Sequence, residues 1–348
     1  MSKDLSLLTR PVTSSLLAAL LLGLGGLAQA QSSVTVFGIV DAGVQYLKNG
    51  DKTLHLLSTD GQQSSRFGLR GVEELGGGLK AGFHLEGALN PDTGTADSNR
   101  FWGRRATVSL ISDAAGEVRL GRDFTPTFWS ISRFNVFGTN GVGGANNLIY
   151  GFDGSSSSAK TIVRSDNSVG YFLPEKLGGV YGQAMVAAGE GSDGKYLGLR
   201  LGYATGPFDV AVALSETDNP GGKKFKVYNL GASYKIGDAQ LMGLYHVSKE
   251  GAREQANYVL GAIYKIGAGQ LRASYVHSEN SGDLKKGDYS GNLFAVGYRH
   301  NLSKRTSLYS TISRVDNSDK GSFVIRGGSA VQAGQSSTGF EAGITHSF

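Results

Sequence analysis

The sequence predicts an all-β protein, a 16-stranded antiparallel transmembrane β-barrel. Three observations lead to this fold class. Apolar and polar residues alternate with period two along most of the chain from Ser33 to Phe348, which is the pattern of strands with one apolar and one polar face. The connections between these segments alternate between short and long, as in outer-membrane barrels. The chain also starts with an export signal.

Composition excludes several classes of protein. Glycine contributes 53 of the 348 residues and proline only 6, which argues against collagen and against a proline-rich disordered chain. Cysteine is absent, so disulfide scaffolds, cysteine metal sites and thiol nucleophiles are excluded. The six histidines are scattered, and we expect neither a metal ion nor a cofactor. The net charge is +5 without blocks of Lys and Arg, so we expect no nucleic-acid partner.

Residues 1–30 are predicted to be a secretory signal peptide. A positively charged start precedes an apolar run over residues 16–27, and Ala28-Gln29-Ala30 matches the cleavage rule for such peptides. The apolar run is shorter than the ~20 residues that a membrane-spanning helix needs. Cleavage would leave residues 31–348 as one exported barrel domain.

Sixteen segments carry the alternating pattern. In the second of them, Phe67 and Leu69 face the opposite side from Arg66 and Arg70. The backbone of a membrane sheet must pair fully, so the sheet is expected to close. The expected strands span residues 33–47, 64–74, 79–90, 101–112, 117–124, 167–174, 179–189, 195–204, 207–217, 225–236, 239–248, 256–267, 269–279, 289–300, 305–315 and 337–348. The long connections are expected at 48–63, 91–100, 125–166, 249–255, 280–288 and 316–336.

Several of these segments resemble a known family. The runs QSSVTVFGIVDAGVQY, SSRFGLRGVEELGGGLKAGFHLEG, GRRATVSL, GEVRLGRDFTP, HNLSKRTSLY and TGFEAGITHSF resemble general porins of Gram-negative outer membranes, most closely the anion-selective trimeric porins of beta-proteobacteria. The resemblance spans nearly the whole mature chain and is loose in the loops at 91–100, 125–166 and 316–336.

The resemblance implies a homotrimer in the cell outer membrane that passes small hydrophilic solutes by passive diffusion. It also implies that the third long loop, residues 125–166, folds inward as the constriction loop. The partners expected on this basis are outer-membrane lipids and lipopolysaccharide, the outer-membrane assembly machinery, and small anionic and neutral solutes.

Arginines are the candidate selectivity residues. By strand parity, Arg66, Arg70, Arg105 and Arg119 point into the lumen. Arg104 has the lipid-facing parity, but it lies near a strand end, where bulges and snorkelling are common. The family resemblance implies that Arg66, either Arg104 or Arg105, and Arg164 of the loop line the narrow zone.

Guanidinium groups suit this role because they stay charged and are weakly hydrated. In a narrow pore, charges of one sign raise the local concentration of counter-ions. The alternative for each arginine is a structural ion pair with a lumen acid such as Glu86, Glu117 or Asp123. Asp123, Asp153 and Asp166 are candidates to face the arginines across the pore, and the sequence does not choose among them.

The C-terminal Phe348 resembles the signal that the outer-membrane assembly machinery recognises. It shares the lipid-facing parity with Phe340, Ala342 and Ile344, so it is also suited to a membrane-interface aromatic position. The resemblance places trimer contacts on the first strand, near Val36 and Val40.

Two further functions compete with a general anion-preferring channel. A substrate-specific sugar channel would need a slide of aromatic side chains, for which Phe128, Trp129, Phe134 and Phe137 are the candidates. A barrel-embedded hydrolase would need a Ser–His pair on the wall; His246 and His277 lie on expected strands, but no serine stands out as a partner. We therefore expect no catalytic residues.

Overall fold

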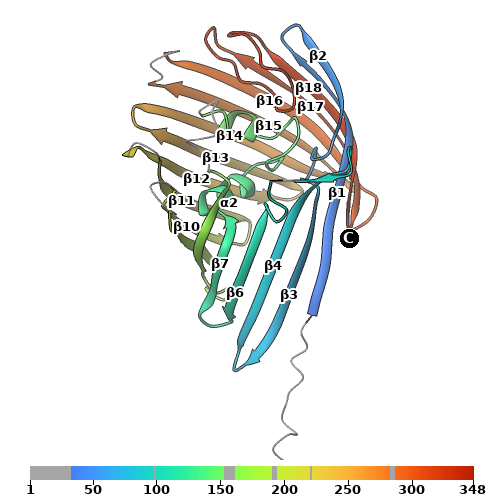
Figure 1. The fold of residues 1–348 in the computed structure, drawn as a ribbon. Coiled ribbons are helices and arrows are strands. Elements are labelled where there is room, and N and C mark those ends of the chain that lie inside the picture. The colour runs from blue at the N-terminus through green and yellow to red at the C-terminus, as the bar shows by residue number, and fades with distance from the viewer. Residues whose placement is uncertain (1–32, 98, 153–160, 190–193, 220–221, 283–286) are drawn as a thin grey trace, which may run out of the picture.

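The computed structural model describes residues 33–97, 99–152, 161–189, 194–219, 222–282 and 287–348. The predicted signal peptide, residues 1–30, lies outside this part of the chain. All the strands belong to a single antiparallel sheet that closes on itself, because β1 (Ser33–Asn49) pairs with β18 (Ser337–Ser347). Figure 1 shows β1 beside β18, the first and last strands of the chain.

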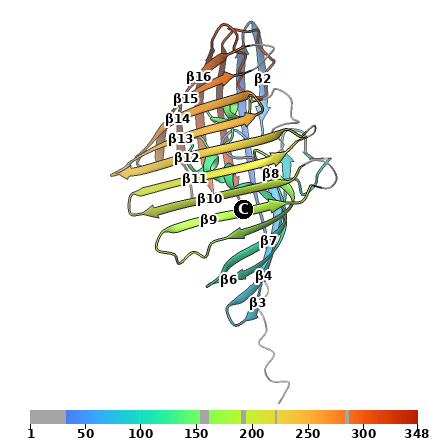
Figure 2. The same cartoon turned by 90° about the vertical axis from the view of Figure 1, so that its left-hand side faces the viewer.

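The remaining strands follow one another around the wall in chain order, as Figure 2 shows for β6 to β16. Their bounds are β2 (Lys52–Ser58), β3 (Arg66–Gly76), β4 (Leu79–Asn90), β5 (Thr95–Ala96), β6 (Arg105–Ser112), β7 (Gly116–Phe124), β8 (Arg164–Phe172), β9 (Val180–Ala187), β10 (Tyr196–Thr205), β11 (Phe208–Asp218), β12 (Lys224–Ile236), β13 (Ala239–Glu250), β14 (Arg253–Ile266), β15 (Gly269–Ser281), β16 (Tyr289–Asn301) and β17 (Thr306–Asn317). Two short helices, α2 (Pro126–Arg133) and α3 (Asn146–Ile149), lie in the described part of the connection between β7 and β8.

The wall has sixteen strand positions within the described residues, as predicted. β2 and β3 both pair with β1, β2 along its second half and β3 along its first, so together they occupy one position. The two-residue β5 pairs only with the end of β4. The prediction of a loop at 48–63 was therefore wrong in part, because β2 lies inside it. Only the turn at 50–51 and residues 59–65 leave the sheet.

Other boundaries also differ from the prediction. The strand expected at 101–112 begins only at Arg105, and the expected loop at 249–255 is a tight turn between β13 and β14. The connection predicted at 125–166 ends at residue 163, because Arg164 already belongs to β8. Neither helix of the described ranges reaches the length and hydrophobicity that crossing a bilayer requires.

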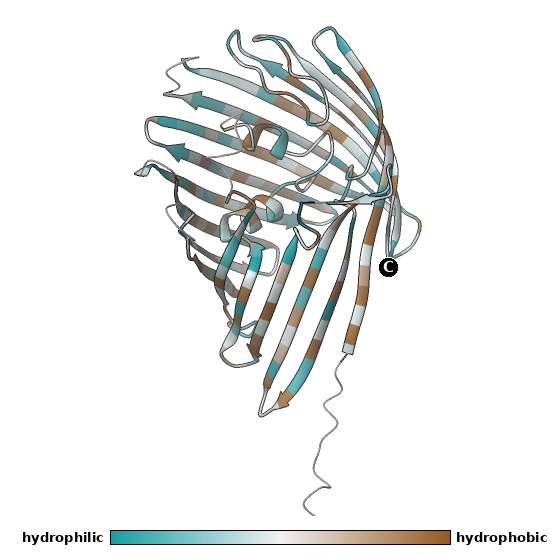
Figure 3. Cartoon of the chain, viewed as in Figure 1, coloured by the Kyte–Doolittle hydropathy of each residue, from teal (hydrophilic) through white to brown (hydrophobic). Residues whose placement is uncertain are grey.

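Each strand presents an apolar outer face, and the inner faces carry polar or small residues, with larger apolar residues also pointing inward mainly on β12–β17. On β10, Leu197, Leu199 and Leu201 are about half exposed, whereas Arg200 is buried. Figure 3 shows the resulting alternation of hydrophobic and hydrophilic residues along the strands. Because the exposed set is apolar, the outer face is suited to lipid, and the hydrogen-bonded ring leaves no free sheet edge along the paired length.

In the segment 125–163, the described residues, 125–152 and 161–163, pack against the inner face of one part of the wall. The segment begins with α2, where the Thr125 hydroxyl accepts a hydrogen bond from the Phe128 amide and caps the helix. The Asn229 side chain donates to the Thr127 carbonyl at 2.6 Å, and the Gln255 side chain donates to the Leu148 carbonyl at 2.8 Å. These bonds tie the segment to β12 and β14.

The hydrophobic core lies between this segment and the wall. Ile131, Phe134, Val142, Leu148 and Ile149 of the segment are fully buried. They belong to one cluster with inward apolar residues of the strands, which include Phe225, Val227, Leu244, Val259, Val276, Leu293 and Val315. The barrel interior is therefore asymmetric, with an apolar contact zone on β12–β17.

Candidate functional site

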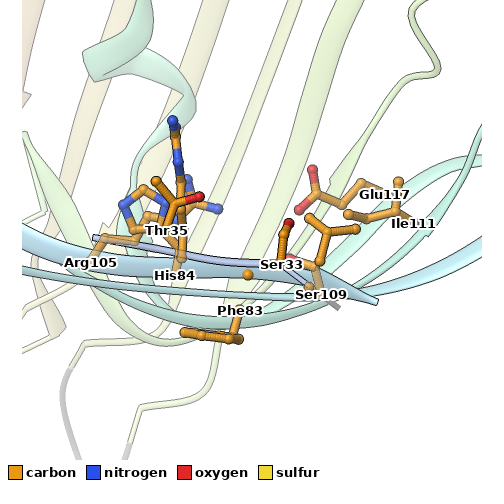
Figure 4. A pocket seen from close by; sticks show the side chains of 12 residues that line it. Ser33, Thr35, Phe83, His84, Arg105, Ser109, Ile111 and Glu117 are labelled. Carbon is orange, nitrogen blue, oxygen red and sulfur yellow. The ribbon is translucent and has the colours of Figure 1, made fainter. Parts of the chain in front are cut away.

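The predicted arginines lie on the other part of the wall, from β3 to β8. Figure 4 shows how strand parity sorts the side chains there, with Arg105, His84 and Thr35 on one side of the sheet and Phe83 on the other. Phe83 is 37% exposed on the outer face. The inward set, with Arg70 and Glu117, lines a cavity of about 290 Å³.

Glu86 on β4 gathers the first group of charges. Arg104 Nε lies 2.5 Å from Glu86 Oε1, and Arg66 Nη1 lies 3.7 Å from the same oxygen. His84 Nε2 approaches the other carboxylate oxygen at 3.3 Å. Glu86 is only 6% exposed, so a single buried carboxylate is shared by two guanidinium groups.

Asp123 at the end of β7 gathers the second group. Arg119 Nη1 lies 2.6 Å from Asp123 Oδ2, and Arg105 Nε lies 3.7 Å from Asp123 Oδ1. Arg119 also makes two hydrogen bonds to Glu117, at 2.9 and 2.8 Å. Both arginines are held in fixed positions on neighbouring strands.

Arg164 joins the two groups without a carboxylate of its own among the described residues. Its Nε donates to the Arg104 carbonyl at 2.8 Å, and its guanidinium lies 4.4 Å from the centre of the Phe124 ring. Arg70 stands apart, exposed, with its guanidinium 5.1 Å from the Phe37 ring centre. The six arginines face the three carboxylates of Glu86, Glu117 and Asp123, which leaves a net charge of +3.

Both Arg104 and Arg105 reach the inner side. Arg104 precedes β6 and is not bound by strand parity, and its amide donates to the Glu86 carbonyl at 3.0 Å. This irregular backbone directs the Arg104 side chain to Glu86, while Arg105 as the first residue of β6 follows the expected parity. The structure therefore does not select one of the two arginines as the inward-facing residue, since each side chain has its own carboxylate partner on the inner side.

A third ion-pair group was missed by the parity argument. Asp166 on β8 pairs with Arg122 at 2.5 Å and with Arg100 at 2.8 Å. Arg122 has the lipid-facing parity in the sequence, but the pairing of β7 with β8 shifts between Gly121 and Asp123, and such irregularities re-aim side chains. Gly121, whose φ is 126° in the structure, is the residue in the sequence that could have indicated this shift in strand pairing. Asp153, the other candidate acid, lies outside the described residues.

Two buried acids on β1 and β18 were also missed. Glu341 accepts a hydrogen bond from the Val142 amide at 3.2 Å, and the Ser313 hydroxyl donates to the Val142 carbonyl at 2.6 Å. Asp41 accepts hydrogen bonds from the Tyr309 hydroxyl and from three successive backbone amides, of residues 61–63. These acids hold the tip of segment 125–163 and the 59–65 excursion against the wall.

The loop aromatics are mostly packed and not displayed. Phe128, Phe134 and Phe137 are each less than a tenth exposed. A Cβ atom added at Gly231 on β12 would overlap the Phe134 ring, and one at Gly297 on β16 would approach the Phe137 ring at 2.9 Å. The rings thus occupy spaces that glycines leave open on the wall, and they do not form an exposed slide.

A Ser–His contact that the sequence did not reveal lies on β13. His246 Nε2 is 2.9 Å from the Ser248 hydroxyl, and its Nδ1 is 2.7 Å from the Asn229 side-chain oxygen. Both His246 and Ser248 are 0% exposed, so no substrate reaches them in this conformation. His277 instead contacts Asn292 and Glu279.

Phe348 ends the chain at the seam of the barrel. Its backbone exchanges two hydrogen bonds with Gly38 of β1, at 3.2 and 3.1 Å. Its ring lies on the outer face, 46% exposed, directly over Gly38. A side chain at position 38 would collide with this ring.

Comparison with known proteins identifies the barrel. The Gram-negative porin family matches residues 15–320. The chain is 36% identical to outer membrane porin protein 32 of Delftia acidovorans, over 96% of this chain and 99% of the relative. The chain belongs to the Gram-negative porin family.

Other relatives agree with this assignment. An outer membrane porin of Bordetella pertussis is 29% identical to this porin, over 84% of its chain and 91% of the relative. Among solved structures, an anion-selective porin from Comamonas acidovorans superposes with a TM-score of 0.82 at 35% identity, covering 91% of this porin and all of that chain. The porin lies in the outer membrane, as the sequence predicted.

Proposed function

We propose that this porin is a water-filled channel for passive diffusion of small hydrophilic solutes, with a preference for anions. The single observation that carries the preference is the excess of arginine on the inner face of β3–β8, where six guanidinium groups meet three carboxylates. The partial pairing keeps the arginines in place, and the surplus positive charge attracts anions. The relative from Comamonas acidovorans is described as anion-selective, which supports the proposal.

The proposal assigns the narrow zone to the space between these arginines and segment 125–163. The hydrogen bonds and apolar contacts of that segment with β12, β14 and β18 support a constriction. The arginines proposed to attract anions are Arg66, Arg70, Arg104, Arg105, Arg119 and Arg164. Glu86 and Asp123 orient the guanidinium groups that pair with them. An ion that bound tightly would not leave, so the weakly hydrated guanidinium is a suitable group.

The proposal extends to assembly and export. Residues 1–30 act as the cleaved signal peptide, the mature chain forms a homotrimer, and Phe348 marks the chain for the assembly machinery. Val36 and Val40 are exposed apolar residues on the outer face of β1, as a protein or lipid contact there requires. Outer-membrane lipids and lipopolysaccharide surround the remaining outer face.

The other two candidate functions have less support. A sugar slide needs exposed aromatic rings, whereas Phe128, Phe134 and Phe137 are buried. Hydrolysis needs a nucleophile that substrate can reach, whereas His246 and Ser248 are both buried. The proposal therefore includes no catalytic role.

The test is the reversal potential of the purified channel in a planar bilayer under a salt gradient. We expect an anionic sign for the unmodified porin and a several-fold lower anion-to-cation permeability ratio for the double variant Arg66→Glu, Arg105→Glu, because two inward positive charges become negative. Arg314→Glu is the control, since Arg314 pairs with Asp316 at an exposed position on β17. An unchanged potential in the double variant would contradict the assignment.

A further inference from the structure

We call the inner face of β3–β8, which carries the six arginines, the arginine wall. A second cavity, with a different lining, lies where four distant parts of the chain meet. Its volume is about 610 Å³. It is lined by Asp60 from the 59–65 excursion, Asp92 from the connection after β4, Asn146 and Asn147 of α3, and Arg326 from the connection after β17. None of the six arginines assigned to the narrow zone lines it.

Opposite charges face this cavity without forming a close ion pair among the described residues. Asp60, Asp92 and Arg326 are all exposed, and within the described residues none of the three makes an ion pair. The Arg326 guanidinium lies 5.5 Å from the centre of the Tyr150 ring. Both signs of charge are therefore available to a bound molecule.

The floor of the cavity is fixed in position. The Asn147 side-chain nitrogen donates to the carbonyls of Gly141, Val142 and Gly144 at 3.0, 3.2 and 2.9 Å. The Asn147 side-chain oxygen accepts from the Arg326 amide at 3.0 Å. One asparagine thus joins the tip of segment 125–163 to the segment that carries Arg326, and a pre-formed site loses less entropy when it binds.

The charge pattern selects the class of ligand. Two carboxylates and one guanidinium give the cavity a net charge of −1, which disfavours simple anions. No group of three acidic or histidine side chains suited to a metal ion occurs among the described residues. A molecule with an ammonium at one end and a carboxylate at the other complements both signs.

We propose that this cavity binds zwitterionic solutes, free amino acids or short peptides, with the ammonium facing Asp60 and Asp92 and the carboxylate at Arg326. Guanidinium binds carboxylate through paired hydrogen bonds, and carboxylates accept hydrogen bonds from ammonium. The amide side chains of Asn146 and Asn147 line the rest of the site. Such a site would hold zwitterions beside a channel whose narrow zone favours anions.

The experiment is calorimetric titration of the detergent-purified porin with glycylglycine. We expect saturable binding that is weakened about tenfold, or ~1.4 kcal/mol, in Asp60→Asn and in Arg326→Gln, since each removes one charge-assisted contact. N-acetylglycylglycine lacks the ammonium and glycylglycinamide lacks the carboxylate, so both should bind more weakly than glycylglycine. The control variants are Arg314→Gln and Asp316→Asn, which neutralise an exposed pair outside the cavity.

Each alternative outcome would overturn the proposal in a distinct way. Equal binding of sucrose and glycylglycine would indicate a polyol site formed by the amides. Stronger binding of N-acetylglycylglycine than of glycylglycine would indicate an anion site. Unchanged binding in both cavity variants would place the ligand elsewhere. Because binding is measured without ion flow, the result is independent of the anion selectivity proposed above, and circular dichroism of each variant checks that the barrel has formed.

Discussion

At the scale of the residue, the guanidinium groups of the arginine wall outnumber the carboxylates that hold them in place. Glu86 is the clearest case, because Arg66 and Arg104 share it and His84 also approaches it. A buried carboxylate between two guanidinium groups holds both side chains and cancels only one of their charges. Its removal therefore changes the field of the pore more than the packing of the wall.

The substitution Glu86→Gln tests this balance. The glutamine keeps the size of the side chain and one acceptor oxygen for Arg66 and Arg104, but it removes the negative charge. We expect the anion-to-cation permeability ratio to rise by about twofold or more, measured as a reversal potential in a salt gradient, because the net charge near the arginines increases by one. Glu279→Gln is the matched control, since Glu279 is an exposed acid at the end of β15. A ratio that stays the same or falls in Glu86→Gln would count against a selective role for these arginines.

At the scale of the element, segment 125–163 is held by glycines and hydrogen-bonding side chains of the wall. Gly231, Gly261, Gly297 and Gly339 lie on alternate strands, β12, β14, β16 and β18, and each leaves room for a side chain of the segment. Period-two patterning predicts an inward small residue at such positions but does not say what fills the space. The partners Phe134, Val136, Phe137 and Val142 come from more than 90 residues away in the chain.

The substitution Gly231→Leu tests this packing. A Cβ at Gly231 already overlaps the Phe134 ring, so we expect the segment to shift and the single-channel current to become larger or noisier, with a destabilisation of ~1–3 kcal/mol from overpacking. Gly243→Leu on β13 is the control, because the nearest atoms to its Cβ lie at an ordinary 3.5 Å. Identical current traces for the two variants would show that the segment does not border the conducting path.

At the scale of the whole molecule, the last residue of the chain extends the β1–β18 seam that closes the barrel. Phe348 contributes two backbone hydrogen bonds to the seam with Gly38 and an exposed ring to the outer face. Pairing at the seam and the proposed recognition by the assembly machinery would thus be two separate contributions of one residue. The backbone bonds survive a change of side chain, so the two contributions can be separated.

The variants Phe348→Ala and a deletion of Phe348 make this separation. If the ring is the assembly signal, both variants should show reduced outer-membrane insertion, measured as the fraction of folded porin in purified outer membranes. Phe340→Ala on the same face of β18, where the ring is 41% exposed, is the control and should insert normally. Normal insertion of Phe348→Ala together with impaired insertion of the deletion would assign the defect to barrel closure alone.

Much of the site could be predicted from local parity. Arg66, Arg70, Arg105 and Arg119 point inward because alternate side chains of a strand lie on opposite faces. Arg104 and Arg122 could not be placed in this way, since one precedes its strand and the other adjoins a shift in strand pairing. Asp41 and Glu341 were missed because their partners, the amides of residues 61–63 and 142, belong to segments that leave the sheet.

The sixteen strand positions, their two faces and the need for closure could be derived from the amino-acid pattern alone, because they follow from period-two patterning and from the cost of unpaired backbone in lipid. Three features could be seen only in the folded barrel: β2 and β3 share one position, a core lies inside the barrel against β12–β17, and particular carboxylates meet particular arginines. Patterning is a property of neighbours in the chain, whereas these contacts join residues that meet only when the sheet has closed around the inner segment.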